Sequence, residues 1–245
     1  MNSTTRRLAA LLGAVSIALA GTACSKSEPT ATPTASPTSS TTTKAPAPKA
    51  SEVVDKAKAN ALAATSGAFT GEVEEKGEKM KIDFKGTKDG DTSDITLDLT
   101  PSGKVRLVTV GDAVYMQGDA AFWKAQGAPA EVVAAGDKFI KAPPGSADGL
   151  AADLTISSFL DEAFTELTPD KIAAEVGEES VNGVDCWVVT DKKGKAEGAL
   201  YVSKDSMELV RFTGSTDSPG QLDFSKWNED LGIKAPPADQ VVDVS

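Results

Sequence analysis

The chain of 245 residues contains no histidine and only two cysteines, with three Trp, two Tyr and eight Phe. The absence of histidine excludes the Ser-His-Asp and Cys-His nucleophile systems and every zinc site that needs an imidazole ligand. Two cysteines are too few for a disulfide-stapled scaffold or a thiolate cluster. We therefore expect a protein that is not an enzyme and that holds no metal or other cofactor.

Basic residues are outnumbered by acidic ones. The chain has 25 basic and 36 acidic residues, which gives a formal net charge of −11. A surface with this balance repels phosphate backbones, so no nucleic-acid partner is expected. Long apolar runs are few. The one from Leu8 to Ala20 is too short to be a membrane-spanning helix.

The first residues have the parts of a secretory signal peptide. Arg6 and Arg7 precede the apolar run, and the small residues Gly21-Thr22-Ala23 lead directly to Cys24. A cysteine in this place resembles the lipobox of bacterial lipoproteins, in which the thiol is diacylated and the cysteine becomes the first residue. Gly21 stands where leucine is commonest in that motif. These features predict a lipoprotein signal peptide over residues 1–23 and lipidation of Cys24. An ordinary cleaved signal is the alternative, and Sec and twin-arginine export both stay open.

Residues 24–50 have the composition of a spacer. Twelve of them are Ser or Thr and five are Pro, and none is aromatic, Val, Leu or Ile. Such a segment cannot bury enough apolar surface to offset the entropy of ordering, so we expect a disordered tether. In an extended polyproline-like form it reaches at most roughly 80 Å. Glycosylation of the tether stays open.

Residues 51–245 form the predicted folded domain, with a net charge of about −15. From Phe69 onward, apolar and polar residues alternate in short runs that are separated by turn signals, as in an antiparallel sheet with one wet face. Asn182-Gly183 is the strongest hairpin signal, because both residues tolerate the positive φ of a type I′ turn. The pattern predicts about ten strands, one of them over Phe122–Gln126.

Helices are predicted in front of the strands and between them. Ser51–Ala64 has helical spacing with Ser51 as its N-cap, and Leu150–Phe164 has helical spacing in the middle of the chain. A short turn of helix is expected over Thr168–Ala174. The fold class is therefore α+β: a large curved antiparallel sheet, or half-barrel, whose concave face is covered by the N-terminal helix and the central helical segment.

Four short motifs, in their order along the chain, carry a resemblance to a known family. They are Gly111–Met116, Phe122-Trp123-Lys124, Asn182-Gly183-Val184, and Asp223–Trp227 followed by Pro236-Pro237. With the lipobox, the tether and the interrupted meander, they resemble the actinobacterial LppX/LprG-type lipoproteins of the LolA-like half-barrel superfamily. The resemblance covers about residues 51–245.

The resemblance implies a lipid-anchored protein on the extracytoplasmic face of the cell membrane. Its apolar cavity would take the acyl chains of a lipid or lipoglycan and carry them across the envelope, with an envelope transporter as a possible partner. Some relatives instead sense lipids or regulate signalling. A signalling or assembly lipoprotein that uses the same fold as a protein-binding surface is therefore the alternative. A hydrolase built on paired carboxylates is a more distant one.

The candidate lipid-binding residues are the apolar positions of the alternating strands and of the central helix. They are Met80, Ile82, Phe84, Ile95, Leu97, Leu99, Val105, Leu107, Val114, Met116, Leu154, Phe159, Leu160 and Phe164. An ordinary core is the alternative reading of the same pattern. The helix over Leu154–Phe164 carries large apolar residues beside the Gly- and Ala-rich residues Gly145–Ala152, which suits a movable lid over an apolar slot.

Two other features, a cysteine and a group of aspartates, are expected to have no chemical function. Cys186 lies in a predicted strand between apolar neighbours, and we expect a buried, inert thiol. Asp89, Asp91 and Asp94 lack the spacing and the terminal Glu of a calcium-binding EF-hand loop, so we expect a solvated turn.

Overall fold

The computed structural model describes residues 46–75, 77–143, 155–165 and 167–242. The predicted signal peptide, Cys24, most of the tether, Leu154 and the Gly- and Ala-rich residues Gly145–Ala152 lie outside these residues. None of the helices in the described ranges is long and apolar enough to cross a membrane.

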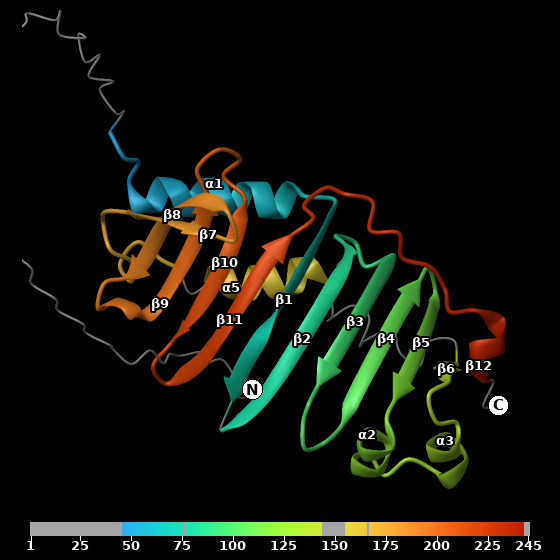
Figure 1. The fold of residues 1–245 in the computed structure, drawn as a ribbon. Helices are drawn as coiled ribbons and strands as arrows, with labels where there is room; N and C mark the ends of the chain where they lie inside the picture. The colour runs from blue at the N-terminus through green and yellow to red at the C-terminus, as the bar shows by residue number, and fades with distance from the viewer. Residues whose placement is uncertain (1–45, 76, 144–154, 166, 243–245) are drawn as a thin grey trace, which may run out of the picture. The chain divides into compact units, whose positions relative to one another are not determined.

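The described residues contain twelve strands and a few helices (Figure 1). The helices are α1 Ala50–Ala63, α2 Ala120–Ala125, α3 Ala130–Ala134, α5 Ile156–Thr165 and the 3₁₀ helix η1 Ala238–Gln240. The strands are β1 Ser66–Glu75, β2 Glu78–Thr87, β3 Thr92–Asp98, β4 Lys104–Val110, β5 Ala113–Gly118, β6 Phe139–Lys141, β7 Gly177–Val181, β8 Val184–Asp191, β9 Gly194–Ser203, β10 Leu209–Ser215, β11 Ser218–Ser225 and β12 Val241–Val242.

All twelve strands belong to one open sheet in the order β12-β6-β5-β4-β3-β2-β1-β11-β10-β9-β8-β7. Every neighbouring pair is antiparallel except β12 and β6. Two meanders, one before and one after α5, are joined where β1 pairs with β11, as in Phe69 opposite Phe224. The first and last long strands of the domain therefore lie side by side in the middle of the sheet.

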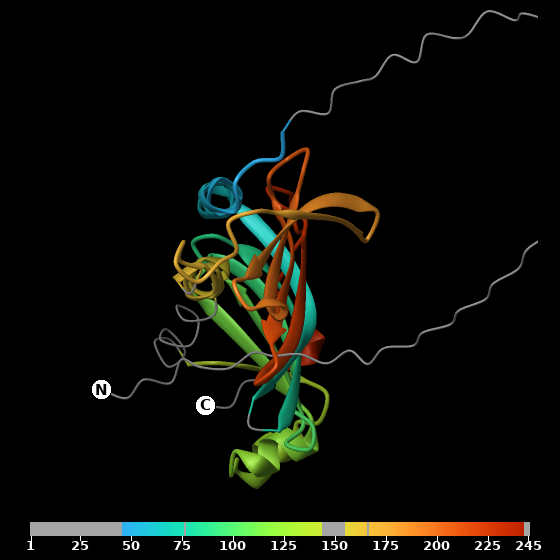
Figure 2. The same cartoon turned by 90° about the vertical axis from the view of Figure 1, so that its left-hand side faces the viewer.

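Two helices lie on the same side of the sheet, as the view along its edge shows (Figure 2). Helix α5 packs against α1 and against β1 and β2. Beneath it, Phe69 stacks on Phe84 with ring centroids 4.9 Å apart and meets the edge of Phe159 at 5.0 Å. This side is called the inner face below. The predicted α+β fold, with a large antiparallel sheet and helices over one face, is confirmed.

The hairpin prediction is confirmed in detail. Asn182 and Gly183 have φ angles of 53° and 81°, and Val181 pairs with Val184 across the turn. The central helix is confirmed as α5 within the described residues.

Three local predictions are wrong, each for a reason visible in the backbone. Phe122–Gln126 is not a strand, because Asp119 caps a helix there by accepting a hydrogen bond from the Phe122 amide at 2.8 Å. Ser51 is not the cap of α1. The helix begins at Ala50, and the Glu52 carboxylate accepts from the Lys49 amide instead, at 3.3 Å. Thr168–Ala174 contains no helix: the Ile172 amide donates to the Thr168 carbonyl at 3.2 Å in a single turn, and Ile172 then forms a β-bridge to Asp191.

Candidate functional site

The strand register places the predicted apolar residues on the inner face. One row crosses β1 to β5 through directly opposed pairs: Phe69 and Phe84, Phe84 and Ile95, Ile95 and Leu107, Leu107 and Met116. A second row runs beside it from Ile82 through Leu97 and Val105 to Gly118. Directly opposed residues share a face, so these side chains form one apolar surface on the inner face.

Burial divides the candidate residues into two groups. Those that are buried, and so contribute to the core, are Ile82, Phe84, Ile95, Val105, Leu107, Val114, Leu160 and Phe164. Those that are half-buried and keep accessible apolar surface are Met80, Leu97, Leu99, Met116 and Phe159. We call the second group the apolar strip. The buried residues of the first group are therefore explained as an ordinary core. The residues of the apolar strip keep apolar surface that is accessible to solvent.

Leu97 connects two clusters of the inner face. On one side it packs against the large cluster formed with α1 and α5, and on the other against a smaller cluster that includes Trp123. The members of this smaller cluster are Val105, Leu107, Phe122, Trp123 and Ile140, with half-buried Leu99, Met116, Ala128, Val132, Val133 and Ala135 against them. Phe122, Trp123 and Ile140 were not among the predicted site residues. The signal that could have placed the two aromatic residues is Asp119, an N-cap residue directly ahead of them.

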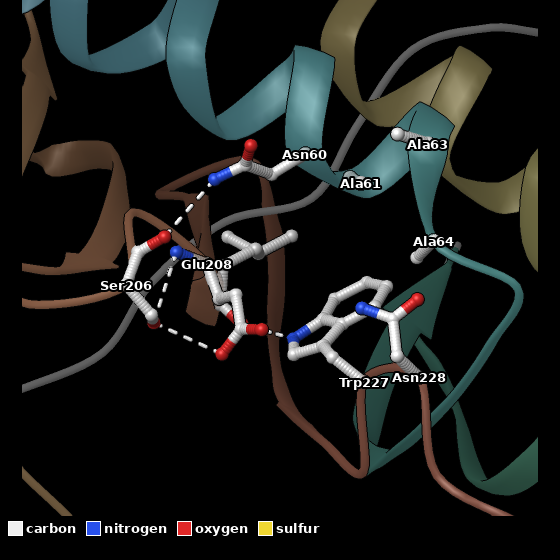
Figure 3. A pocket seen from close by; sticks show the side chains of 9 residues that line it. Asn60, Ala61, Ala63, Ala64, Ser206, Glu208, Trp227 and Asn228 are labelled. Atoms are coloured by element: carbon white, nitrogen blue, oxygen red, sulfur yellow. Dashed lines mark hydrogen bonds between the residues drawn. The ribbon is translucent and has the colours of Figure 1, made fainter.

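A cavity of about 270 Å³ lies elsewhere, between the end of α1, the turn from β9 to β10 and the segment after β11 (Figure 3). It is lined by Asn60, Ala61, Ala63, Ala64, Ser206, Glu208, Leu209, Trp227 and Asn228, and by no candidate lipid-binding residue.

Several polar groups around this cavity form hydrogen bonds within the protein. The side-chain amide of Asn60 donates to the backbone carbonyls of Ser206 and Met207 at 3.0 and 3.1 Å. The Trp227 indole donates to the Leu209 carbonyl at 2.9 Å. Its volume also lies below the roughly 300–1,000 Å³ of small-molecule sites. We interpret these hydrogen bonds as contacts that hold α1 on the sheet, and we do not assign the cavity as a binding site.

The outer face of β2 to β4 carries paired charges. Arg106 contacts both carboxylate oxygens of Asp94 at 2.8 Å, Lys85 lies 3.2 Å from the same carboxylate, and Lys104 lies 3.0 Å from Asp98. Burial acts to raise the pKa of Asp94, but the hydrogen bonds and charges of Arg106 and Lys85 outweigh it and lower the pKa below its ordinary value. Hydrogen bonds from Thr100 and Lys104 lower the pKa of Asp98 to about 2.

Acid should therefore weaken the folded state in a defined range. Because both pKa values are lower in the folded chain, the stability they give is complete above the unfolded value of about 3.9 and is lost as the pH falls through the folded values. We expect the free energy of unfolding to fall between pH of about 4 and about 2. Asp94→Asn and Arg106→Gln should each flatten this dependence in urea titrations; an unchanged slope in both would contradict the assignment.

The predicted burial of Cys186 is confirmed, and the predicted turn holds for Asp89 and Asp91 but is wrong for Asp94, which lies in β3. Cys186 is fully buried, its thiol donates to the Val184 carbonyl at 3.4 Å, and burial and then Asp185 raise its pKa. The Asp91 amide donates to the Asp89 carboxylate at 3.2 Å, as in a turn, whereas the Asp94 side chain is largely buried and paired with Arg106. Within the described ranges, no three cysteine or carboxylate side chains gather closely enough to hold a metal ion.

No protein-family model matches the chain, and no curated protein matches it. Among solved structures, LprF from Mycobacterium bovis superposes with a TM-score of 0.51 at 12% identity, over 76% of this chain and 96% of that one. The lipoprotein LppX from Mycobacterium tuberculosis gives 0.46 at 15% identity, over 76% and 98%. The MucA/MucB complex from Pseudomonas aeruginosa gives 0.32 at 12% identity, over 78% and 59%. The chain thus has the fold of LprF, and the resemblance to the LppX/LprG-type lipoproteins is confirmed at the level of the fold.

Proposed function

We propose that this chain is a membrane-anchored lipoprotein that binds the acyl chains of a lipid or lipoglycan on the inner face of its sheet and carries them within the bacterial envelope. The observation that carries the proposal is the apolar strip. Its five large side chains keep accessible surface next to a packed core, on the face that the helices share. Burying such surface against hydrocarbon contributes about 25 cal/mol per Å² before the costs of association.

The N-terminal sequence supports the proposed location. A charged start, an apolar run and Cys24 after small residues fit lipidation at Cys24 and residence on the outer side of the cell membrane. Two or more acyl chains on one residue anchor stably, since each buried CH₂ contributes about 0.8 kcal/mol. The Ser/Thr/Pro-rich residues 24–50 would then let the domain reach away from the surface. Binding needs no catalytic group, and none is assigned.

Native mass spectrometry on the processed chain tests the binding. The chain would carry Cys24→Ser, so that the anchor adds no lipid of its own, and would be purified from an actinobacterial host. We expect a stoichiometric acyl-containing adduct that is lost in Leu97→Trp, because the larger ring fills the centre of the strip. Val184→Trp is the matched control. It introduces the same large ring at an apolar residue of β8 that is exposed to solvent and is not part of the apolar strip.

Two results would count against the proposal. A clean apo mass with no uptake of added lipid would mean that the inner face is only a core, and would favour the protein-binding use of the fold. An adduct that survives Leu97→Trp but disappears in Val184→Trp would place the lipid somewhere else.

A further inference from the structure

Trp123 carries a hydrogen-bond donor that the described protein does not use. The residue is 8% exposed, and the indole nitrogen Nε1 has no hydrogen-bond partner among the described residues. Trp227 is different, because its indole donates to the Leu209 carbonyl at 2.9 Å. A buried N–H without an acceptor is costly and rare, so a specific explanation is required.

The nitrogen edge of the Trp123 ring lies against the inner face of β5. A methyl group added at Gly118 would come within 2.8 Å of Trp123 Cε2 and 3.0 Å of Nε1. Gly118 is directly opposite Val105, and Val105 is directly opposite Leu97. The unpaired N–H is therefore on the same face as the apolar strip, beside the row of residues that contains Leu97.

The Trp123 ring belongs to a buried cluster of aliphatic and aromatic residues. The nearby Asp119 carboxylate is already engaged, since it accepts from the Phe122 and Lys104 amides at 2.8 and 3.0 Å. An acceptor that enters such a place must be uncharged, because an ionised carboxylate would lose its hydration without gaining a cation in this cluster. The acceptor must also bring no donor of its own that would then stay unpaired. The carbonyl oxygen of an ester or amide meets both conditions.

We propose that Trp123 Nε1 donates a hydrogen bond to the carbonyl oxygen of an acyl ester or amide whose hydrocarbon chain lies along Leu97, Leu99 and Met116. This inference rests on the proposed function and makes it more specific. The ligand is then an acylated lipid whose linkage enters the apolar face, rather than a free fatty acid or a hydrocarbon without a carbonyl.

Two lipids that differ only in the carbonyl test this assignment. Dipalmitoyl phosphatidylglycerol has ester linkages, and its dihexadecyl analogue has ether linkages at the same chain length. The chain carrying Cys24→Ser should bind the ester about two- to tenfold more tightly, as expected for one neutral hydrogen bond. Trp123→Phe keeps an apolar ring but removes the donor, so it should bind both lipids equally. Trp187→Phe, on β8, is the matched control and should keep the preference.

A second measurement needs no substitution at the site. In ¹⁵N-labelled protein, the indole N–H signal of Trp123 should move downfield when the ester lipid is added and should move less with the ether lipid. The signals of Trp187 and Trp227 should not discriminate between the two lipids.

Failure of this inference and of the proposed function give different results. If the wild-type domain binds both lipids equally, or the Trp123 signal ignores the ester, the assignment to Trp123 is wrong while acyl binding stands. If the wild-type domain binds neither lipid, the proposed function fails and the assignment fails with it.

Discussion

Phe69→Ala is expected to lower the free energy of unfolding by about 3–5 kcal/mol, the usual cost of removing a buried phenylalanine ring. Phe69 is fully buried, and its ring contacts Phe84, Phe159 and Phe224, with centroids 4.9, 5.0 and 5.4 Å away. The substitution therefore leaves a cavity bordered by β2, α5 and β11 together. Small domains are stable by only about 5–15 kcal/mol, so the loss is a large part of the total. Urea denaturation followed by circular dichroism measures it.

Phe212→Ala is the matched control for this prediction. Phe212 lies in β10 and is only half-buried at the border of the same cluster. Its removal should cost clearly less, because solvent already reaches part of the ring and the remaining cavity is smaller. Equal losses in the two variants would show that the ring stack around Phe69 has no special weight in the core.

Gly71→Ala should prevent the two meanders from joining. Gly71 lies in β1 opposite Leu222 of β11. A methyl group there would overlap the backbone carbonyl oxygen of Gln221 and come within 2.9 Å of a Leu222 methyl carbon. Backbone cannot move aside as a flexible side chain can, so β1 and β11 must separate locally. A glycine inside a strand marks such a close approach. We expect loss of soluble, protease-resistant protein, measured by limited proteolysis and the yield of folded chain.

Gly177→Ala is a strict control, because it makes the same chemical change in a strand that has room for it. A methyl group at Gly177, in the edge strand β7, would lie 3.6 Å from the nearest Val188 carbon, an ordinary van der Waals contact. Its effect should stay within about 0.5 kcal/mol. If Gly71→Ala is as stable as Gly177→Ala, the paired strands β1 and β11 can accommodate the methyl group and the prediction is wrong.

The alternation of apolar and polar residues was enough to predict the long strands and the face that each side chain takes. Ile82, Ile95 and Leu107 lie on the inner face as predicted, because a residue's parity in a strand fixes its side. The hairpin at Asn182-Gly183 was predictable for a local reason as well, since only certain residues tolerate positive φ.

Features that depend on distant partners were not predictable in this way. Strands β6 and β12 have three and two residues, too few to show a period, and they exist because they pair with β5 and with each other. The position of Trp123 depends on the Asp119 cap, which outweighs the strand-like composition of Phe122–Gln126. Alternation also could not separate the buried candidates from the strip, because burial depends on where the helices lie.

The pairing of β1 with β11 has a consequence for when the protein can fold. The paired residues Phe69 and Phe224 are about 150 residues apart, so closing this contact must offset the loop entropy of nearly the whole domain. Non-local pairings of this kind slow folding. A chain that emerges N-terminus first can form the β1–β5 meander early, but one edge of β1 stays open until β11 arrives. An exported chain would therefore complete its sheet only after almost all of it had left the translocation channel, and until then the open edge is what a chaperone would have to protect.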